Sequence, residues 1–149
     1  MIRIRGPEKL FDLDVVGYEF PNAIDHDDAN WLAVKISASD DDFTWEAEDS
    51  CLLTSELNEF KYWLQAISNR QPVNKIISFL EGELSFRYGF EDDVLEVGLD
   101  FIFHPKGERY IYGENGDKKY LMSFPLNRNI RGVIKSIDAI LDKYPERIN

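Results

Sequence analysis

The chain has 149 residues, 44% of them apolar, and its 28 acidic and 17 basic residues give a net charge of −11. This length predicts a single domain over residues 1–149, and a domain of this size buries about two thirds of its unfolded surface. The negative charge excludes the basic classes that bind nucleic acid or anionic lipid directly, and it favours either a basic protein partner or a simple role in solubility.

One cysteine, Cys51, leaves no intrachain disulfide framework, which suits a reducing cytosol. Residues 1–6 lack the apolar core of about 7–15 residues that a secretory signal needs. No apolar run approaches the roughly 18 residues of a membrane-spanning helix. We therefore expect a cytoplasmic protein that does not enter a membrane.

Alternating apolar residues predict strands at the start of the chain. Residues 2–5 form a short edge strand. In residues 11–20 the apolar face changes near Val15 and Val16, which predicts either a bulge or burial of both faces. An acidic loop is expected over residues 22–29.

Two strands and a helix follow as one predicted unit. Residues 30–39 and 43–48 alternate with period two, and they form a hairpin around the acidic turn Asp40–Asp42. Thr54 or Ser55 is suited to cap the next helix. The apolar residues of that helix keep helical spacing: Leu57, Phe60, Leu64 and Ile67.

Two further hairpins are predicted in the second half of the chain. Residues 84–90 and 95–103 alternate strictly on either side of a short acidic turn. Asp100 falls on the solvent face of the second of these strands. Residues 110–112 and 120–124 flank a stretch that carries an Asn-Gly turn signal.

A single apolar stripe predicts a helix near the C-terminus. It consists of Ile130, Val133, Ile134, Ile137, Ile140, Leu141 and Tyr144. Asn127 or Asn129 caps this helix, and Pro145 stops it. With a short strand at 76–80, the order of strands, helix, strands and helix predicts an α+β fold. We expect a curved antiparallel β-sheet of about 7–8 strands with hairpin connections, packed by two α-helices.

No pattern of residues indicates a catalytic, cofactor or metal site. His26 lies among acids, but EF-hand spacing fails because the sixth and twelfth positions from Asp25 are Asn30 and Ile36. Cys51 precedes a predicted helix, where a dipole lowers a thiol pKa, yet its apolar neighbours indicate a small buried residue. Phosphate-binding Gly-rich loops and nucleophile elbows are absent from the sequence. We therefore expect no catalytic residue, no metal and no cofactor.

Several segments occur in a characteristic order along the chain. They are Gly17-Tyr18-Glu19-Phe20-Pro21, Asp28-Ala29-Asn30-Trp31-Leu32, Cys51-Leu52-Leu53-Thr54 with Glu56-Leu57 and Trp63, and, more weakly, Ser78-Phe79, Leu84-Ser85-Phe86 and Phe124-Pro125. Together they resemble the WapI family of bacterial immunity proteins, whereas the stretch from Asp100 to Gly116 departs from that pattern. The resemblance implies a cytoplasmic protein that neutralises the C-terminal toxin of a wall-associated contact-dependent system, typically a tRNA nuclease. It implies no catalytic motif.

The acidic charge agrees with this resemblance, because a toxin that acts on RNA carries a basic surface. The hypothesis is an immunity protein that binds and neutralises a basic toxin domain, which is an RNA-cleaving nuclease. The immunity protein itself is not expected to be an enzyme. The predicted interface consists of Asp40, Asp41, Asp42, Trp45, Glu46, Glu48 and Asp49, with Trp45 or Tyr18 as an aromatic anchor.

Other readings remain open. Trp45 shares a strand face with Phe43, which favours a place in the core over a role as an exposed anchor. The whole chain also fits a small-ligand-binding or structural module in which the acids only maintain solubility. An enzyme that holds a divalent ion among its acids is the third alternative.

Overall fold

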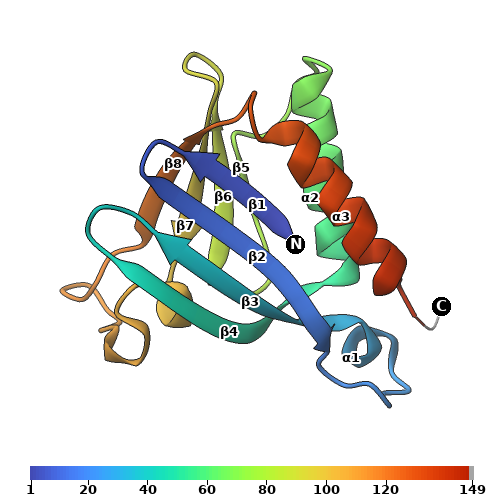
Figure 1. Ribbon diagram of the computed structural model, residues 1–149. Helices are drawn as coiled ribbons and strands as arrows, with labels where there is room; N and C mark the ends of the chain where they lie inside the picture. The colour runs from blue at the N-terminus through green and yellow to red at the C-terminus, as the bar shows by residue number, and fades with distance from the viewer. Residues whose placement is uncertain (148–149) are drawn as a thin grey trace.

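Eight antiparallel strands form two four-stranded sheets in the computed structural model, which describes residues 1–147 (Figure 1). Sheet A contains, in spatial order, β1 (Ile2–Gly6), β2 (Lys9–Tyr18), β3 (Trp31–Ser39) and β4 (Thr44–Leu53). Sheet B contains β5 (Ile76–Ser78), β6 (Leu84–Gly89), β7 (Val94–Leu99) and β8 (Tyr120–Pro125). The helices are α1 (His26–Asn30), α2 (Thr54–Ser68) and α3 (Ile130–Lys143), and two 3₁₀ turns, η1 (Phe101–Phe103) and η2 (Gly107–Arg109), follow β7. The α+β class is confirmed, with the strands divided between two sheets.

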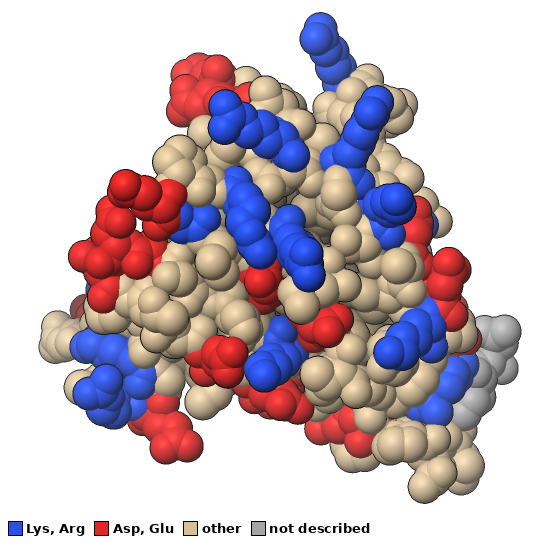
Figure 2. Space-filling view, viewed as in Figure 1, with Lys and Arg blue, Asp and Glu red and all other residues tan. Residues whose placement is uncertain are grey.

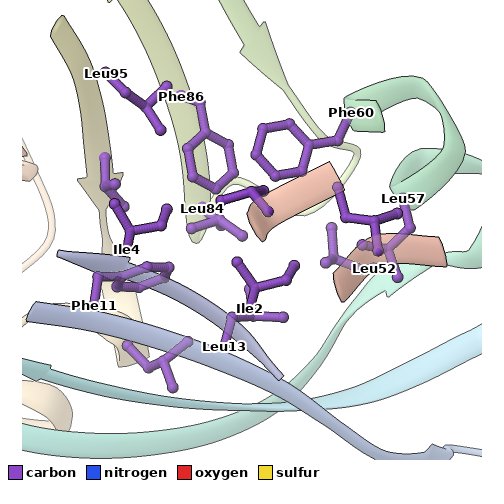
Figure 3. Close-up of a cluster of buried hydrophobic side chains, with 14 of the residues drawn as sticks. Ile2, Ile4, Phe11, Leu13, Leu52, Leu57, Phe60, Leu84, Phe86 and Leu95 are labelled. Atoms are coloured by element: carbon purple, nitrogen blue, oxygen red, sulfur yellow. The ribbon is translucent and has the colours of Figure 1, made fainter. Parts of the chain in front are cut away.

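The core lies between the two sheets and the long helices α2 and α3, which pack side by side (Figure 1). Alternate residues of each strand face inward because successive side chains of a strand point to opposite faces. Figure 3 shows side chains of both sheets and α2 meeting in this interior: Ile2, Ile4, Phe11, Leu13, Leu57, Phe60, Leu84 and Phe86. The rings of Phe60 and Phe86 stack with centroids 4.2 Å apart. Burying one such side chain stabilises the fold by about 1.5–3 kcal/mol.

Two local predictions in the first half are confirmed. The pairing of β2 with β3 shifts register between Val15 and Gly17, which is the bulge, the first of the two predicted alternatives. Cys51 is buried as expected of a small apolar residue. The predicted acidic loop, however, contains the short helix α1, because the Asp25 side chain accepts the N–H groups of Asp27 and Asp28 at 2.9 and 3.4 Å.

The helix α2 begins differently from the prediction. Its N-cap residue is Leu53, and neither Thr54 nor Ser55 caps it. The N–H of Leu53 donates to Oε1 of the buried Glu56 at 3.0 Å, and Oε2 of Glu56 accepts the N–H of Leu80 at 2.7 Å. One carboxylate therefore satisfies the helix start and holds the segment after β5 against it.

The strand predicted to reach residue 103 ends at Leu99. Asp100 is the N-cap of η1 and accepts the N–H of Phe101 at 3.1 Å, so it is not a solvent-facing strand residue. This side-chain bond to the backbone competes with the strand ladder, a competition that alternation of apolar residues does not reveal. Residues 110–112 form no strand either, and β8 pairs directly with β7.

The predicted N-cap of α3 is correct in position but not in its bonding. Asn129 occupies the predicted N-cap position, but its side chain makes no capping bond. Instead it bridges to β1, because Oδ1 accepts the N–H of Arg5 at 2.8 Å and Nδ2 donates to the Arg5 carbonyl at 2.9 Å. The residue therefore joins the helix to the edge of sheet A.

Candidate protein-binding surface

The acidic turn, residues 40–43, is built around the side chain of Asp40. Its Oδ1 accepts the N–H groups of Asp42 and Phe43, each at 2.9 Å, and the Asp40 N–H donates to the Phe43 carbonyl at 2.9 Å. An aspartate at the first position of a turn stabilises it in this way. Asp41 and Asp42 are left exposed to solvent. The turn therefore uses one acidic side chain for its own structure and presents two.

The same carboxylate also joins the turn to sheet B. The hydroxyl of Tyr120, on β8, donates to Oδ2 of Asp40. Partial burial acts to raise the pKa of Asp40, but the bonds from Tyr120, Phe43 and Asp42 outweigh it and hold the pKa below its ordinary value. Burial and the same bond raise the pKa of Tyr120. Asp40 is therefore ionised and fixed at neutral pH.

The remaining predicted acids lie on β4 in two different environments. Glu46 and Glu48 are exposed on the outer face of sheet A, and Lys35 on β3 lies 3.8 Å from Glu46. Asp49 is half-buried and lies beside Glu83, which precedes β6. The predicted residues therefore lie in three environments: an exposed turn, an exposed strand face beside Lys35, and a half-buried contact with Glu83.

The two proposed aromatic anchors are both engaged within the protein. Trp45 packs against the core, on the opposite face of β4 from Glu46, and its Nε1 donates to the Phe103 carbonyl at 2.9 Å. Tyr18 lies at the far end of sheet A, where the Arg147 guanidinium sits 3.6 Å from its ring centroid. Neither side chain is brought together with Asp41 and Asp42 as an exposed anchor.

An aromatic row, absent from the sequence prediction, leads away from the acidic turn and passes below the surface at the buried His104. Its members are Phe43, Tyr120, His104, Tyr110, Phe101 and Tyr112, with successive ring centroids 5.7, 5.9, 5.1, 5.6 and 5.6 Å apart. Such separations are typical of favourable aromatic pairs. Figure 1 shows the acidic turn and the β7–β8 connection on the left of the view, away from α2 and α3. The sequence signal that could have found the row is the density of Phe and Tyr between β7 and β8.

The family model for the WapI-like immunity proteins matches residues 1–145. The chain belongs to this family. The resemblance drawn from the ordered segments is therefore confirmed, and family membership supports a toxin-neutralising role in general. Comparison with curated proteins gave no match.

The charge of this immunity protein is unevenly distributed. Figure 2 shows acidic side chains gathered at the left edge of the view, where the acidic turn lies in Figure 1. Basic side chains cross the upper part of the same view, over β1 and the start of α3. Arg3, Arg5 and Arg128 together line one pocket. The net charge of −11 is therefore not spread evenly over the surface, and the acidic turn is a local region of negative charge.

The groups considered for chemistry have structural surroundings. Cys51 lies in the core, where burial and then the carboxylates of Glu83 and Asp49 raise the pKa of its thiol, which opposes a nucleophilic role. His26 approaches Glu146 at 3.2 Å and Asp27 at 3.5 Å. Within residues 1–147, no group of three or more His, Cys, Asp or Glu side chains is arranged to hold a metal ion. No helix of that described part is long and apolar enough to cross a membrane.

Proposed function

We propose that this immunity protein binds a basic toxin domain, an RNA-cleaving nuclease, in the cytoplasm and neutralises it through the acidic turn and the adjoining aromatic row. The observation that supports this location is the exposure of Asp41 and Asp42 directly beside the exposed ring of Phe43. Carboxylates around an aromatic side chain suit a partner surface rich in Lys and Arg.

The residues of the predicted interface take different parts in this proposal. Asp41 and Asp42 meet the toxin, and Glu46 and Glu48 extend the negative surface along the outer face of β4. Asp40 fixes the turn through its bonds to Tyr120 and the backbone. Trp45 and Asp49 support the surface from the inner side of the strand, where both are half-buried.

The physical basis of neutralisation is competition for a positive surface. A nuclease binds the phosphates of RNA with Lys and Arg, so its RNA-binding surface carries a positive potential. An acidic protein approaches such a surface quickly and, once seated, excludes the RNA. No reaction by the immunity protein is required.

The test measures the association rate constant with the toxin domain encoded beside this protein. Asp41→Asn with Asp42→Asn removes two charges from the turn, and Glu91→Gln with Asp92→Asn removes two exposed charges from the β6–β7 turn as the matched control. We expect the first pair to slow association about 5–10-fold at low salt and the control less than about twofold.

Inhibition of RNA cleavage by the toxin domain is assayed in parallel. If the isolated, active toxin domain neither binds the unaltered protein nor is inhibited by it, the proposal is contradicted. Equal effects of the two variant pairs contradict the assignment to the acidic turn and leave a role for overall charge only.

A further inference from the structure

The connection between β7 and β8 is held in one shape by Asp117. Its Oδ2 accepts the N–H of Ile111 at 2.7 Å, its own N–H donates to the Ile111 carbonyl at 2.6 Å, and Lys106 forms an ion pair with Oδ1. The bond from Lys106, followed by the bond from the Ile111 N–H, lowers the pKa of Asp117. The carboxylate is therefore charged at neutral pH, and the network is intact. The tip of this segment is therefore a fixed structure.

A close backbone approach tightens the same tip. A Cβ atom on Gly116 would lie 2.1 Å from the Ile111 carbonyl oxygen, a distance that no side chain tolerates. The Gly116 N–H also donates to the Gly113 carbonyl at 3.0 Å. Glycine is needed here because two backbone segments touch.

Phe101 adds backbone strain at the base of the segment. Its φ angle is 52°, a left-handed conformation that is unfavourable for a bulky residue. The conformation directs the ring to stack on Tyr112, with centroids 5.6 Å apart. Strained residues of this kind concentrate at functional sites.

The fixed segment exposes apolar side chains instead of burying them. Tyr112 is 79% exposed, Ile111 63% and Phe101 36%. Ordering exposed apolar side chains on a strained backbone costs free energy of folding and gives the core nothing in return. The same arrangement favours binding, because a preordered apolar side chain loses little entropy when a partner covers it.

We propose that Phe101, Ile111 and Tyr112 form the apolar anchor of the toxin-binding surface and insert into an apolar pocket of the basic toxin domain. Ring contacts link this anchor to the acidic turn through the half-buried Tyr120 and the buried His104, so the two exposed ends of the row are held in a fixed relation. The partner pocket is therefore flanked by Lys and Arg that face Asp41 and Asp42. The acids set the rate of approach, and the anchor sets the lifetime of the complex and the choice of toxin. This inference rests on the proposed function above.

The experiment measures association and dissociation rate constants for two matched double variants. Ile111→Ser with Tyr112→Ser removes the tip of the anchor. Ile24→Ser with Leu80→Ser removes two exposed apolar side chains elsewhere, since Ile24 is 91% and Leu80 75% exposed. We expect the first pair to raise the dissociation rate constant about tenfold or more with little change in association, and the control pair to change neither.

Two single variants test the role of shape. Gly116→Ala disturbs the tip, and we expect about threefold or faster dissociation with unchanged cooperative unfolding of the core. Phe101→Gly removes both the strain and the ring, so we expect unchanged or higher stability together with faster dissociation. A residue with only a structural role would lower stability and leave dissociation unaffected.

The outcomes separate the two proposals. Binding by the unaltered protein with equal dissociation from both double variants overturns the anchor and leaves the proposed function standing. Absence of any binding by the unaltered protein overturns the proposed function and the anchor with it. A dimer of the unaltered protein that Ile111→Ser with Tyr112→Ser converts to a monomer assigns the segment to contact between copies and also overturns the anchor.

Discussion

Sheets A and B meet at two carboxyl groups that have opposite protonation behaviour. At one contact, Asp40 accepts the hydroxyl of Tyr120 from β8, and its pKa lies below the ordinary value. At the other, Glu83 lies beside Asp49 of β4, and burial followed by the interaction with Asp49 raises the pKa of Glu83 from 4.5 to about 8. Both contacts join the same two sheets, yet Asp40 is charged at neutral pH whereas Glu83 keeps its proton.

The difference lies in the number of donors that each group finds. Asp40 accepts bonds from two backbone N–H groups and one hydroxyl. Oε2 of Glu83 is buried with no hydrogen-bond partner among the residues that the structure describes, and the side chain with the largest effect on it, Asp49, is another acid. A carboxyl group without donors keeps its proton, because burial disfavours the charged form. A count of acids in a sequence therefore overstates the charge that a partner meets.

The two contacts also predict opposite dependence of stability on pH. Asp40, whose pKa is lowered by folding, contributes stability above its unfolded pKa, and this is lost as pH falls through the folded pKa. Glu83, whose pKa is raised, holds one more proton folded than unfolded between about pH 4.5 and about 8. The free energy of unfolding therefore falls across that window as pH rises.

The largest expected effect comes from Asp40→Ala. The substitution removes the acceptor of three donors and leaves the half-buried hydroxyl of Tyr120 unpaired. We expect the free energy of unfolding at pH 7 to fall by about 3 kcal/mol in urea titrations. Asp41→Ala, at the exposed neighbouring position, is the control and should change the free energy of unfolding by less than about 0.5 kcal/mol. Equal losses at the two positions would contradict the contact between the sheets.

Glu83→Gln should act in the opposite direction. Glutamine has no charge to desolvate, so the variant avoids the deprotonation that destabilises the folded state as pH rises. We expect it to be more stable than the unaltered protein by about 2 kcal/mol at pH 8 and nearly equal at pH 5, a value discounted from the full shift for partial solvation. Urea titrations at the two pH values measure it, with the exposed Glu91→Gln as control. A stabilisation that is the same at both pH values would exclude titration of Glu83 as its cause.

The elements that could be predicted from the sequence are those with a local period. The β3–β4 and β6–β7 hairpins follow from alternation of apolar residues, and α3 follows from one apolar stripe. The failures at Asp100 and Glu56 have a common cause. Each side chain accepts a backbone N–H, and the apolar pattern does not reveal such a bond. Asp100 accepts the N–H of Phe101, which the pattern assigns to a strand, and Glu56 accepts the N–H of Leu53 at the start of a helix whose expected cap was Thr54 or Ser55.

The candidate surface could be predicted only in its acidic half. Three consecutive aspartates mark a turn, but Asp40 and Tyr120 are 80 positions apart, and no local pattern joins them. The aromatic row depends in the same way on where the chain returns after β7. Sequence reasoning also grouped Trp45 with Glu46 and Glu48 by proximity, although a strand directs them to opposite faces.

A contact between sheet A and the turn η1 carries no charge and should have a smaller effect. Nε1 of Trp45 donates to the Phe103 carbonyl at 2.9 Å, which ties β4 to η1. Trp45→Phe keeps most of the ring packing and loses this bond, so we expect a loss of about 1 kcal/mol that does not vary between pH 5 and pH 8. Urea titrations at these pH values provide the measurement, and a marked pH dependence would indicate that the substitution disturbs Asp40 or Glu83 instead.

The smallest effect is expected where carboxylates stay in water. Lys35 and Glu46 lie 3.8 Å apart on the outer face of sheet A, and their side chains are 46% and 65% exposed. Solvent screens this pair, and holding two long side chains together costs entropy, so Glu46→Gln should lower the free energy of unfolding by less than about 0.5 kcal/mol. The difference should vanish in about 0.5 M salt, whereas the effect of Asp40→Ala should persist because the bonds of Asp40 are direct and partly buried. Similar salt sensitivity at both positions would mean that Asp40 is as solvated as Glu46, and the contrast between contacts at the sheet boundary and charges on the outer face would fail.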